Sequence, residues 1–366
     1  MFLMKQIRVG LKKRGYDIIV GNAVLGSLGR FLKKTGCDGT AMVITNPSIK
    51  KLWGKKVASS LRNSGREAIF LEIADTEKSK SIATSLKLLN KISSSSRSKK
   101  IFIIALGGGV VGDVGGFVAS IYKRGIPYIQ MPTTLLAQVD SAIGGKVAID
   151  LKVGKNLAGA FYQPRLVFSD TAFLSTLPKR QIANGLSEVI KCAVIKDPSL
   201  FNFLERNLGR ILRLDKTSVE YVISKTSAIK ARLVEKDEYD KLEIRIALNY
   251  GHTIGHAIEA ASGFSKRYTH GEAVSIGMTA ANFIATQRGL LSESTSQRIR
   301  RLLEKTGLPT KARGVDPQKI YDAHLYDKKF TGRKNRFVLI SNIGKVKVVE
   351  DIPEKLIKKA IAAVCA

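Results

Sequence analysis

Three of the four histidines in this 366-residue chain fall within one short window. Histidine is the commonest metal ligand and the side chain that titrates nearest neutrality. His252 and His256 are four residues apart, so on a helix they would lie one turn apart on the same face. His270 follows a turn rich in glycine and serine, and a different element could therefore return it to the same place. The alternative interpretation is two partly buried structural histidines and one histidine in a loop.

A carboxylate that could complete a metal site is Glu188, which the sequence pattern places with Lys191 on one face of a helix. One carboxylate with two imidazoles leaves positions open on a Zn²⁺-like ion, as a catalytic site requires. Ligands in helical bundles come from different helices, so the long gap to His252 is no obstacle. The metal would act as a Lewis acid on a substrate hydroxyl or carbonyl. The alternative is a solvated helix carboxylate paired with Lys191.

The elements that must position these residues differ between the two halves of the chain. Apolar runs predict strands at 7–9, 16–20, 40–45, 67–73, 101–106 and 126–131, and helical periodicity predicts helices at 24–34, 46–63 and 80–92. This alternation is typical of βαβ units and a parallel sheet. A polar low-complexity loop is expected at 93–100.

A glycine-rich turn follows the strongest of these apolar runs. Gly107, Gly109 and Gly112 satisfy G-x-G-x-x-G between a strand and a helix that reaches about residue 122. Glycines let the backbone approach a pyrophosphate, and a helix N-terminus offers free N–H groups. No acidic residue stands about twenty positions later, and Asp113 follows the last motif glycine directly. The loop therefore lacks the usual ribose-anchor spacing of a dinucleotide site.

Hydroxyl and basic side chains suggest an anionic ligand. Thr133 and Thr134 follow the run at 126–131, and Lys146 and Lys155 stand beside glycines. Together with a metal site and a dinucleotide loop, so many cations imply an acidic polyhydroxy substrate, carboxylated or phosphorylated. The alternative for any single lysine is surface charge. Further basic residues that could contact such an anion are Lys191, Lys230, Arg245, Lys328 and Lys329.

The length suggests two domains, each with its own core. We expect an α/β Rossmann-like nucleotide-binding domain over 1–178 and an all-α helical domain over 179–366, with short strands only at 336–340 and 346–349. No apolar run reaches the roughly 18 residues that a membrane span needs. The chain starts directly with a strand pattern, and not with a signal peptide. Three widely spaced cysteines are typical of a reducing cytoplasm.

The charge is unusually positive, with 61 Lys+Arg against 30 Asp+Glu, a formal net charge of +31. One interpretation is nucleic-acid binding. The basic residues are spread along the whole chain, however, and no zinc-finger, RNP or helix-turn-helix signature is present. A solvated basic surface, with some lysines recruited to an anionic substrate, is the interpretation that we favour.

Over nearly its whole length the chain resembles the 3-dehydroquinate synthase family of the sugar-phosphate cyclase group. The motifs that carry the resemblance are Gly-Gly-Gly-Val-Val-Gly-Asp (107–113), Arg-Gly (124–125), Pro-Thr-Thr-Leu-Leu-Ala-Gln-Val-Asp-Ser (132–141), Gly-Gly-Lys (144–146), Gly-Lys-Asn-Leu (154–157), Glu-Val-Ile-Lys (188–191), Leu-Asn-Tyr-Gly-His-Thr-Ile-Gly-His-Ala (248–257), His-Gly-Glu (270–272) and Asp-Lys-Lys (327–329).

The resemblance implies a dehydroquinate synthase-like fold, a divalent metal (zinc or cobalt) and NAD. The implied metal ligands are Glu188, His252 and His270, which leaves His256 as a substrate or outer-sphere residue. The implied NAD contacts are Asp75, Thr76, Glu77, Lys78, Ser79, Lys80, Gly109, Val110, Val111, Gly112, Asp113, Thr133, Thr134, Lys146, Lys155, Phe173, Leu174, Ser175 and Thr176. The implied substrate and catalytic residues are Arg124, Asp140, Lys146, Asn156, Lys191, Lys230, Arg245, Asn249, His256 and one of Lys328 or Lys329.

The implied activity is that of a phosphorus–oxygen lyase of the shikimate pathway, which supplies chorismate and the aromatic amino acids. It would convert 3-deoxy-D-arabino-heptulosonate 7-phosphate to 3-dehydroquinate and phosphate by transient NAD oxidation, phosphate elimination, re-reduction and aldol cyclisation. The resemblance also implies a homodimer. From the cysteines, the apolar runs and the spread of charge we expect a cytoplasmic protein with neither nucleic-acid nor membrane partners.

The sequence departs from the family pattern at two places. Glu243-Ile244 stands where the family usually has a glycine and a hydrophobic residue before the arginine, and the spacing from Lys230 is one residue longer. Thr76 stands where the family usually has glycine. The alternative functions are another sugar-phosphate cyclase, acting on sedoheptulose 7-phosphate or glucose 6-phosphate, and a metal-dependent polyol dehydrogenase. The combination of Arg245 and Asn249 with Lys230 suits a carboxylated substrate, which favours the dehydroquinate assignment.

Overall fold

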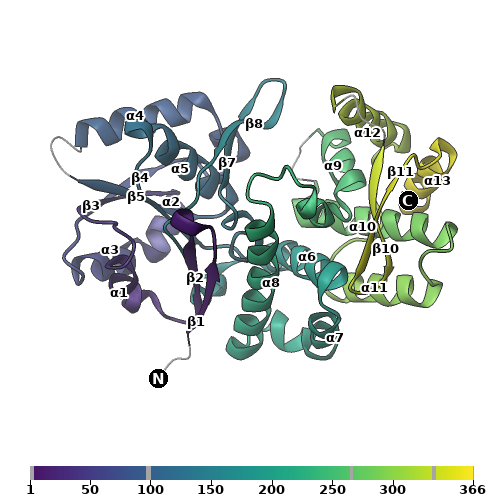
Figure 1. The fold of residues 1–366 in the computed structure, drawn as a ribbon, viewed down its shortest axis with the longest axis horizontal. Coiled ribbons are helices and arrows are strands. Elements are labelled where there is room, and N and C mark those ends of the chain that lie inside the picture. Colours follow the sequence, from purple (N-terminus) through teal and green to yellow (C-terminus); the bar gives the residue numbers. More distant parts are fainter. Residues whose placement is uncertain (1–3, 96–99, 264–266, 332–334, 366) are drawn as a thin grey trace. The chain divides into compact units, whose positions relative to one another are not determined.

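The computed structural model describes residues 4–95, 100–263, 267–331 and 335–365, with backbone alone for 326–331. Its contacts divide the chain into two units (Figure 1). The N-terminal unit comprises Met1–Leu177 and Val219–Tyr239, and the C-terminal unit comprises Pro178–Ser218 and Asp240–Ala366. Helix α8 (Lys216–Lys236) therefore belongs largely to the N-terminal unit. No described helix is both long enough and apolar enough to cross a membrane.

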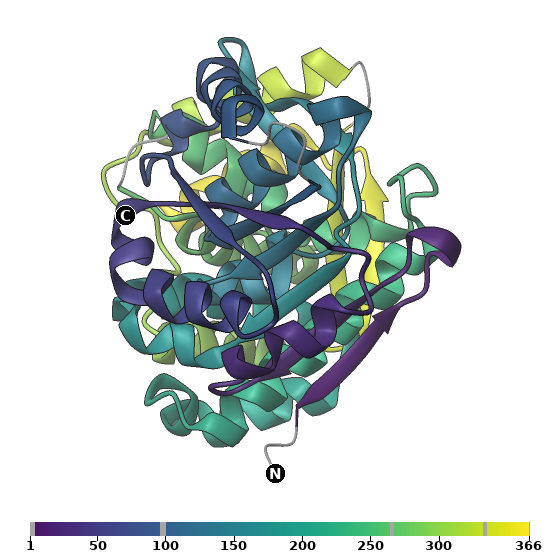
Figure 2. The same cartoon turned by 90° about the vertical axis from the view of Figure 1, so that its left-hand side faces the viewer.

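Seven of the described strands of the N-terminal unit form one sheet in the order β1-β2-β9-β6-β5-β3-β4. Neighbouring strands are parallel except β1 and β2, which form an antiparallel hairpin at one edge (Figure 2). The strand bounds are β1 (Lys5–Val9), β2 (Tyr16–Gly21), β3 (Thr40–Thr45), β4 (Ala68–Glu72), β5 (Ile101–Gly107), β6 (Tyr128–Pro132) and β9 (Leu166–Asp170).

Helices cover both faces of this sheet, which explains the continuous apolar run in β5. Phe102, Ile104 and Leu106 belong to one apolar cluster, with residues of α1 and α3. Ile103 and Ala105 belong to a second cluster, with residues of α4 and α5. Besides α8, the helices of the unit are α1 (Leu28–Leu32), α2 (Pro47–Ile49), α3 (Lys55–Arg62), α4 (Ile82–Ser95) and α5 (Gly109–Ile121). The predicted doubly covered parallel sheet is confirmed.

The glycine-rich turn lies where the strand order reverses. The chain passes from β3 to the edge strand β4 and then returns to β5 on the other side of β3. Open α/β sheets bind ligands outside the carboxyl ends of strands at such a reversal. Gly107 ends β5 and Gly109 begins α5 at this point.

The shorter 3-10 and π turns of the N-terminal unit are η1 (Lys12–Arg14), η2 (Leu25–Ser27), η3 (Lys50–Gly54), η4 (Glu77–Ser79), η5 (Tyr122–Arg124), η6 (Ala137–Ser141) and η7 (Thr171–Thr176).

Three strands of the N-terminal unit are absent from the sequence prediction. The lysine-containing segment after residue 144 forms an antiparallel hairpin of β7 (Lys146–Leu151) and β8 (Gly154–Phe161). Because every residue of β8 is exposed or half-buried, it shows no clean apolar alternation. The third, β9, is fully buried but only five residues long. Of the predicted polar loop at 93–100, residues 96–99 lie outside the described part of the chain, and α4 extends to Ser95.

The C-terminal unit is helical, as predicted, with one two-stranded hairpin. Its elements are α6 (Lys179–Lys196), α7 (Pro198–Leu212), η8 (Ile244–Asn249), α9 (His252–Ala261), α10 (His270–Gln287), α11 (Glu293–Lys305), α12 (Pro317–Thr331), β10 (Arg336–Asn342), β11 (Lys345–Glu350) and α13 (Glu354–Val364). The hairpin β10–β11 matches the two short strands expected near the end of the chain.

A first prediction concerns the packing of α5 on its neighbours. A Cβ on Gly116 would lie 2.3 Å from Cγ1 of Val147 and 3.2 Å from Cε2 of Tyr128. We expect Gly116→Ala to lower the free energy of unfolding by about 1–3 kcal/mol, because overpacking outweighs the gain in helix propensity. Denaturant unfolding measures the change. Gly26→Ala is the control, since a Cβ there would meet no atom within 4 Å. Equal stability of the two variants would contradict the prediction.

Candidate functional site

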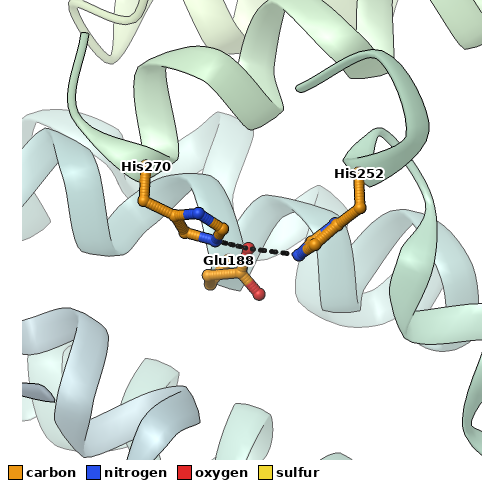
Figure 3. Close-up of side chains that lie close together, drawn as sticks. All are labelled: Glu188, His252 and His270. Atoms are coloured by element: carbon orange, nitrogen blue, oxygen red, sulfur yellow. Dashed lines mark ion pairs between the residues drawn. The ribbon is translucent and has the colours of Figure 1, made fainter. Parts of the chain in front are cut away.

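The C-terminal unit brings Glu188, His252 and His270 together (Figure 3). The Nε2 atoms of His252 and His270 lie 3.9 Å and 3.7 Å from the same oxygen, Oε1 of Glu188. One possible ligand atom from each residue lies within 4.8 Å of the others. One carboxylate with two imidazoles is the donor set of a catalytic Zn²⁺ site that keeps a position open for substrate.

The environment of Glu188 fits a divalent cation. Its side chain is 1% exposed, and neither buried oxygen accepts a hydrogen bond from the described residues. Lys191 forms an ion pair with Oε2, and its own side chain is 2% exposed. The predicted pairing with Lys191 thus exists, but it is buried and not solvated. A buried carboxylate is costly unless paired cations or a metal compensate for the lost water.

Close helix packing brings the two histidines together. His252 and His270 are the first residues of α9 and α10. A Cβ on Gly277 of α10 would lie 1.9 Å from the carbonyl oxygen of Gly251, the residue before His252. Gly251 itself has a φ of 82° and also lies against α10. The absence of a side chain at both positions lets the ring centroids of the histidines approach to 5.3 Å.

A second close contact joins α10 to α6. The N–H of Gly271 donates a 2.6 Å hydrogen bond to Oδ1 of Asn184. A Cβ on Gly271 would lie 2.2 Å from the carbonyl oxygen of Asn184 and 2.4 Å from Oγ of Ser187. His270 is thereby held beside the turn of α6 that carries Glu188.

Charge sets the protonation of the three donors. Burial opposes ionisation of Glu188, but Lys191 and the protonated His270 hold the pKa of its carboxyl well below the usual value. Burial and the charge of Lys191 lower the pKa of His252 well below its usual value, so this imidazole is neutral. Burial also acts to lower the pKa of His270, but the nearby carboxylates of Glu188 and Glu259 raise it to about 10. Without metal, His270 therefore holds a proton that a bound cation would displace.

The other ring nitrogen of His270 faces Glu259, a residue for which the sequence analysis proposed no role. Nδ1 of His270 lies 3.4 Å from Oε2 of Glu259. A carboxylate in this position fixes the tautomer and aims the opposite nitrogen at a metal. The available signal was the spacing of Glu259, three residues after His256 on one helix face. His256 is exposed and lies outside the group around Glu188, but forms a second group of closely spaced donors with Glu259 and His270.

The remaining predicted residues of this unit differ in exposure. Arg245 is buried in η8, whereas Asn249 at the end of the same turn is exposed. Lys328 and Lys329 lie in the backbone of α12, and their side chains are outside the described residues.

In the N-terminal unit the predicted cofactor residues form a second polar cluster. The buried Nζ of Lys80 donates a 2.7 Å hydrogen bond to Oδ2 of Asp113 and also contacts Oδ1 of Asn156. Glu77 lies 3.8 Å from Nζ of Lys80 and 3.7 Å from Nζ of Lys155. Burial raises the pKa of Asp113 to about 6, although the charge of Lys80 acts in the opposite direction. Three predicted cofactor segments, at 75–80, 109–113 and 155, therefore meet here, with Asn156 among them.

The predicted phosphate loop lies beside the loop after β6. A Cβ on Gly108 would lie 3.2 Å from Cγ2 of Thr134, and the N–H of Thr133 donates a 2.9 Å hydrogen bond to the carbonyl of Gly107. Gly112 instead packs on the sheet, where a Cβ would lie 2.9 Å from the side-chain oxygen of Gln130.

The other predicted residues of the N-terminal unit are spread more widely. The side chains of Phe173 and Leu174 are buried, so only their backbone groups could meet a ligand. Nζ of Lys230 donates hydrogen bonds of 2.6 Å and 2.5 Å to the carbonyl and Oδ1 of Asp140. Arg124 and Lys146 are exposed.

Comparison with known proteins gives concordant results for both parts of the chain. Residues 70–184 match the family model for the 3-dehydroquinate synthase N-terminal region, and residues 185–330 match the model for its C-terminal region. A 3-dehydroquinate synthase from Desulforamulus reducens is 45% identical over 352 residues, which cover 96% of this chain and 98% of the relative.

Two solved structures share the fold. A 2-deoxy-scyllo-inosose synthase complexed with carbaglucose-6-phosphate, NAD⁺ and Co²⁺ has a TM-score of 0.88 at 29% identity and covers 99% of each chain. A 2-epi-5-epi-valiolone synthase from Streptomyces hygroscopicus subsp. jinggangensis, with NAD⁺ and Zn²⁺ bound, has a TM-score of 0.87 at 25% identity. It covers 95% of this chain and 96% of its own.

A second prediction follows from the contact between α10 and α6. Gly271→Ala should displace His270 from Glu188 and lower the divalent-metal content of the purified protein at least tenfold, because loss of one ligand's geometry costs affinity on that scale. Elemental analysis after dialysis measures the content. Gly209→Ala on the exposed face of α7 is the matched control, with its nearest atom at 3.6 Å, and should keep the metal. Full metal content in Gly271→Ala would show that this contact does not position the histidine.

A third prediction concerns protons released on metal binding. Since the pKa of His270 is raised to about 10 without metal, uptake near pH 7 should release about one proton per ion. The logarithm of the binding constant should then rise by about one per pH unit as the pH increases toward 9. Calorimetry in buffers of different ionisation enthalpy counts the protons. His256→Ala should leave the count unchanged, and a count near zero would mean that His270 is already neutral.

Proposed function

The chain belongs to the 3-dehydroquinate synthase family, and we infer that it converts 3-deoxy-D-arabino-heptulosonate 7-phosphate into 3-dehydroquinate and phosphate. The observation that carries this inference is the 45% identity to a relative of that name over 96% of the chain. As a phosphorus–oxygen lyase of the shikimate pathway, the enzyme contributes to the synthesis of chorismate and the aromatic amino acids.

The cofactors are NAD and a divalent metal, zinc or cobalt, as in the two solved neighbours. For the metal we propose the ligands Glu188, His252 and His270, whose donor types and closely spaced ligand atoms fit such an ion. When bound, the metal polarises a substrate oxygen, and NAD⁺ supplies a reversible oxidant. For NAD we propose the contacts implied by the sequence, at 75–80, 109–113, Thr133, Thr134, Lys146, Lys155 and 173–176.

The charges of the C-terminal unit support an anionic substrate. Lys191 is buried and positively charged beside Glu188, so it offers an ammonium to a substrate oxygen near the metal ligands. The guanidinium of Arg245 suits bidentate recognition of a carboxylate. We propose Asn249 and His256 as further contacts from this unit, with His256 exposed and able to exchange a proton with substrate.

In the N-terminal unit, Lys230 and Asp140 form a charged pair. This pairing fixes the direction of the ammonium before any ligand arrives, and it lowers the entropy lost on binding. The proposed substrate contacts of this unit are Arg124, Asp140, Lys146, Asn156 and Lys230.

We propose in addition that the enzyme is a cytoplasmic homodimer whose partners are small molecules, and neither nucleic acid nor a membrane. The three cysteines are free thiols, which suits a reducing compartment. A sugar-phosphate substrate agrees with the basic character of the chain.

A fourth prediction separates this function from its neighbours. With NAD⁺ and Zn²⁺ or Co²⁺ added, we expect phosphate release from 3-deoxy-D-arabino-heptulosonate 7-phosphate, and at least a hundredfold less from sedoheptulose 7-phosphate or glucose 6-phosphate, because Arg245 would lack its carboxylate partner. No net NADH should accumulate, whereas a polyol dehydrogenase would accumulate it. Phosphate release from sedoheptulose 7-phosphate or glucose 6-phosphate, without release from the heptulosonate phosphate, would overturn the assignment.

Variants of the histidine window serve as controls for the same assay. Glu188→Ala and His270→Ala should lose both metal and phosphate release. His256→Ala should keep most of the metal while turnover falls, because it lies outside the group of donors around Glu188. Loss of metal in His256→Ala would instead place it among the ligands.

A further inference from the structure

Glu243 has a backbone conformation that side chains rarely adopt. Its φ of 61° and ψ of 7° lie in the left-handed region, where glycine is favoured. A non-glycine residue held there is disfavoured by a factor of roughly five to thirty in population. Glu243 is the residue immediately before η8, the turn that carries Arg245 and Asn249. A turn that begins with such a residue needs an interaction that holds it.

Arg336 supplies that interaction. Its Nη1 lies 2.6 Å from Oε1 of Glu243, and its Nη2 lies 2.8 Å from Oε2. This is the bidentate geometry in which guanidinium and carboxylate interact most strongly and most directionally. The arginine is only 22% exposed, and its Nε lies 3.0 Å from Oε1 of Glu350 on β11. The guanidinium is therefore fixed from the hairpin side as well.

The same arginine also contacts the segment that follows η8. Its carbonyl oxygen accepts a 3.4 Å hydrogen bond from Oγ1 of Thr253, the residue after His252. Arg336 is the first residue of β10, and the next four residues of that strand are buried. One residue at the start of a packed hairpin therefore contacts both ends of the segment 243–253. That segment contains Arg245, Asn249 and the metal-ligand candidate His252.

We propose that the ion pair between Glu243 and Arg336 is a positioning device, which holds η8 in the conformation that presents Arg245 and Asn249 to the substrate. The inference rests on the proposed function, because it takes these two residues as substrate contacts. Neither Glu243 nor Arg336 touches substrate in this account. The ion pair offsets the free-energy cost of the left-handed backbone conformation at Glu243. A glycine at that position would adopt this conformation without the pair.

This dependence gives a rescue experiment. Arg336→Gln removes the bidentate pair. Nothing then offsets the free-energy cost of the left-handed backbone conformation at Glu243. We expect KM for the heptulosonate phosphate to rise roughly three- to tenfold, with kcat changed less than twofold. The double variant Arg336→Gln with Glu243→Gly should return KM to within about twofold of the wild type, since glycine adopts the left-handed conformation without strain.

Hydrogen exchange of the turn provides a readout that does not depend on activity. The N–H groups of Ile246 and Tyr250 donate to the carbonyls of Glu243 and Ala247, at 3.2 Å and 3.3 Å. In Arg336→Gln their exchange should accelerate roughly three- to tenfold, and the added glycine should restore protection. If the wild type does not turn over this substrate, the proposed function fails while the exchange data still decide the positioning role.

A matched control isolates the pair. Arg298→Gln removes a second arginine–glutamate pair of the same unit, with Glu205. It should leave KM and the exchange of η8 unchanged. If Arg336→Gln does not fold, Glu243→Gln removes the pair from the other side and should give the same rise in KM. Unchanged KM and exchange in Arg336→Gln and Glu243→Gln would overturn the proposal. So would a defect in Arg336→Gln that Glu243→Gly does not rescue.

Discussion

The buried carboxylate of Glu188 is the constraint on which the C-terminal unit depends. A carboxylate removed from water and without hydrogen bonds destabilises a fold by several kcal/mol unless positive charge lies close by. Lys191 meets one oxygen, and the imidazoles of His252 and His270 face the other. The elevated pKa of His270 and the depressed pKa of Glu188 are two consequences of this arrangement. A site that must hold a proton when empty is well suited to hold a cation.

Small residues make the arrangement sterically possible. Helices that carry ligands must approach more closely than ordinary side chains allow, and the chain has glycine at the contacts of α10 with α9 and with α6. At Glu243 the chain does the reverse: a charged residue occupies a backbone conformation that favours glycine. The ion pair with Arg336 stabilises that conformation. Glu243 is also at one of the two places where the sequence departs from the family pattern, which usually has glycine there. A left-handed φ is the conformation that glycine adopts without strain.

The sequence predicted most reliably what local periodicity controls. Burial on both faces makes β5 a continuous apolar run, so this strand and its glycine turn could be predicted from residues 101–112. The parallel sheet followed from the alternation of strands and helices over 7–131. The exposed strand β8 shows no such pattern and was not anticipated. Helical spacing by itself would pair His252 with His256, yet the structure groups His252 with His270. That grouping depends on how α9 packs on α10, which no spacing within either helix specifies. The contact of Glu259 with His270 also joins two helices and was equally inaccessible.

Helix α8 has a consequence for how the polypeptide is made. Its residues contact the N-terminal unit through Ser227 with Gln138, Lys230 with Asp140 and Glu235 with Gly10, yet they are separated in sequence from the rest of that unit. After Leu177 a ribosome must add 62 residues, 178–239, to complete the segment that ends at Tyr239. At ~5–20 residues per second this takes about 3–12 seconds. During that interval the nascent N-terminal unit lacks this helix, and Asp140 lacks its lysine. The N-terminal unit is therefore a discontinuous domain whose completion during translation waits for a piece of the chain that follows α7.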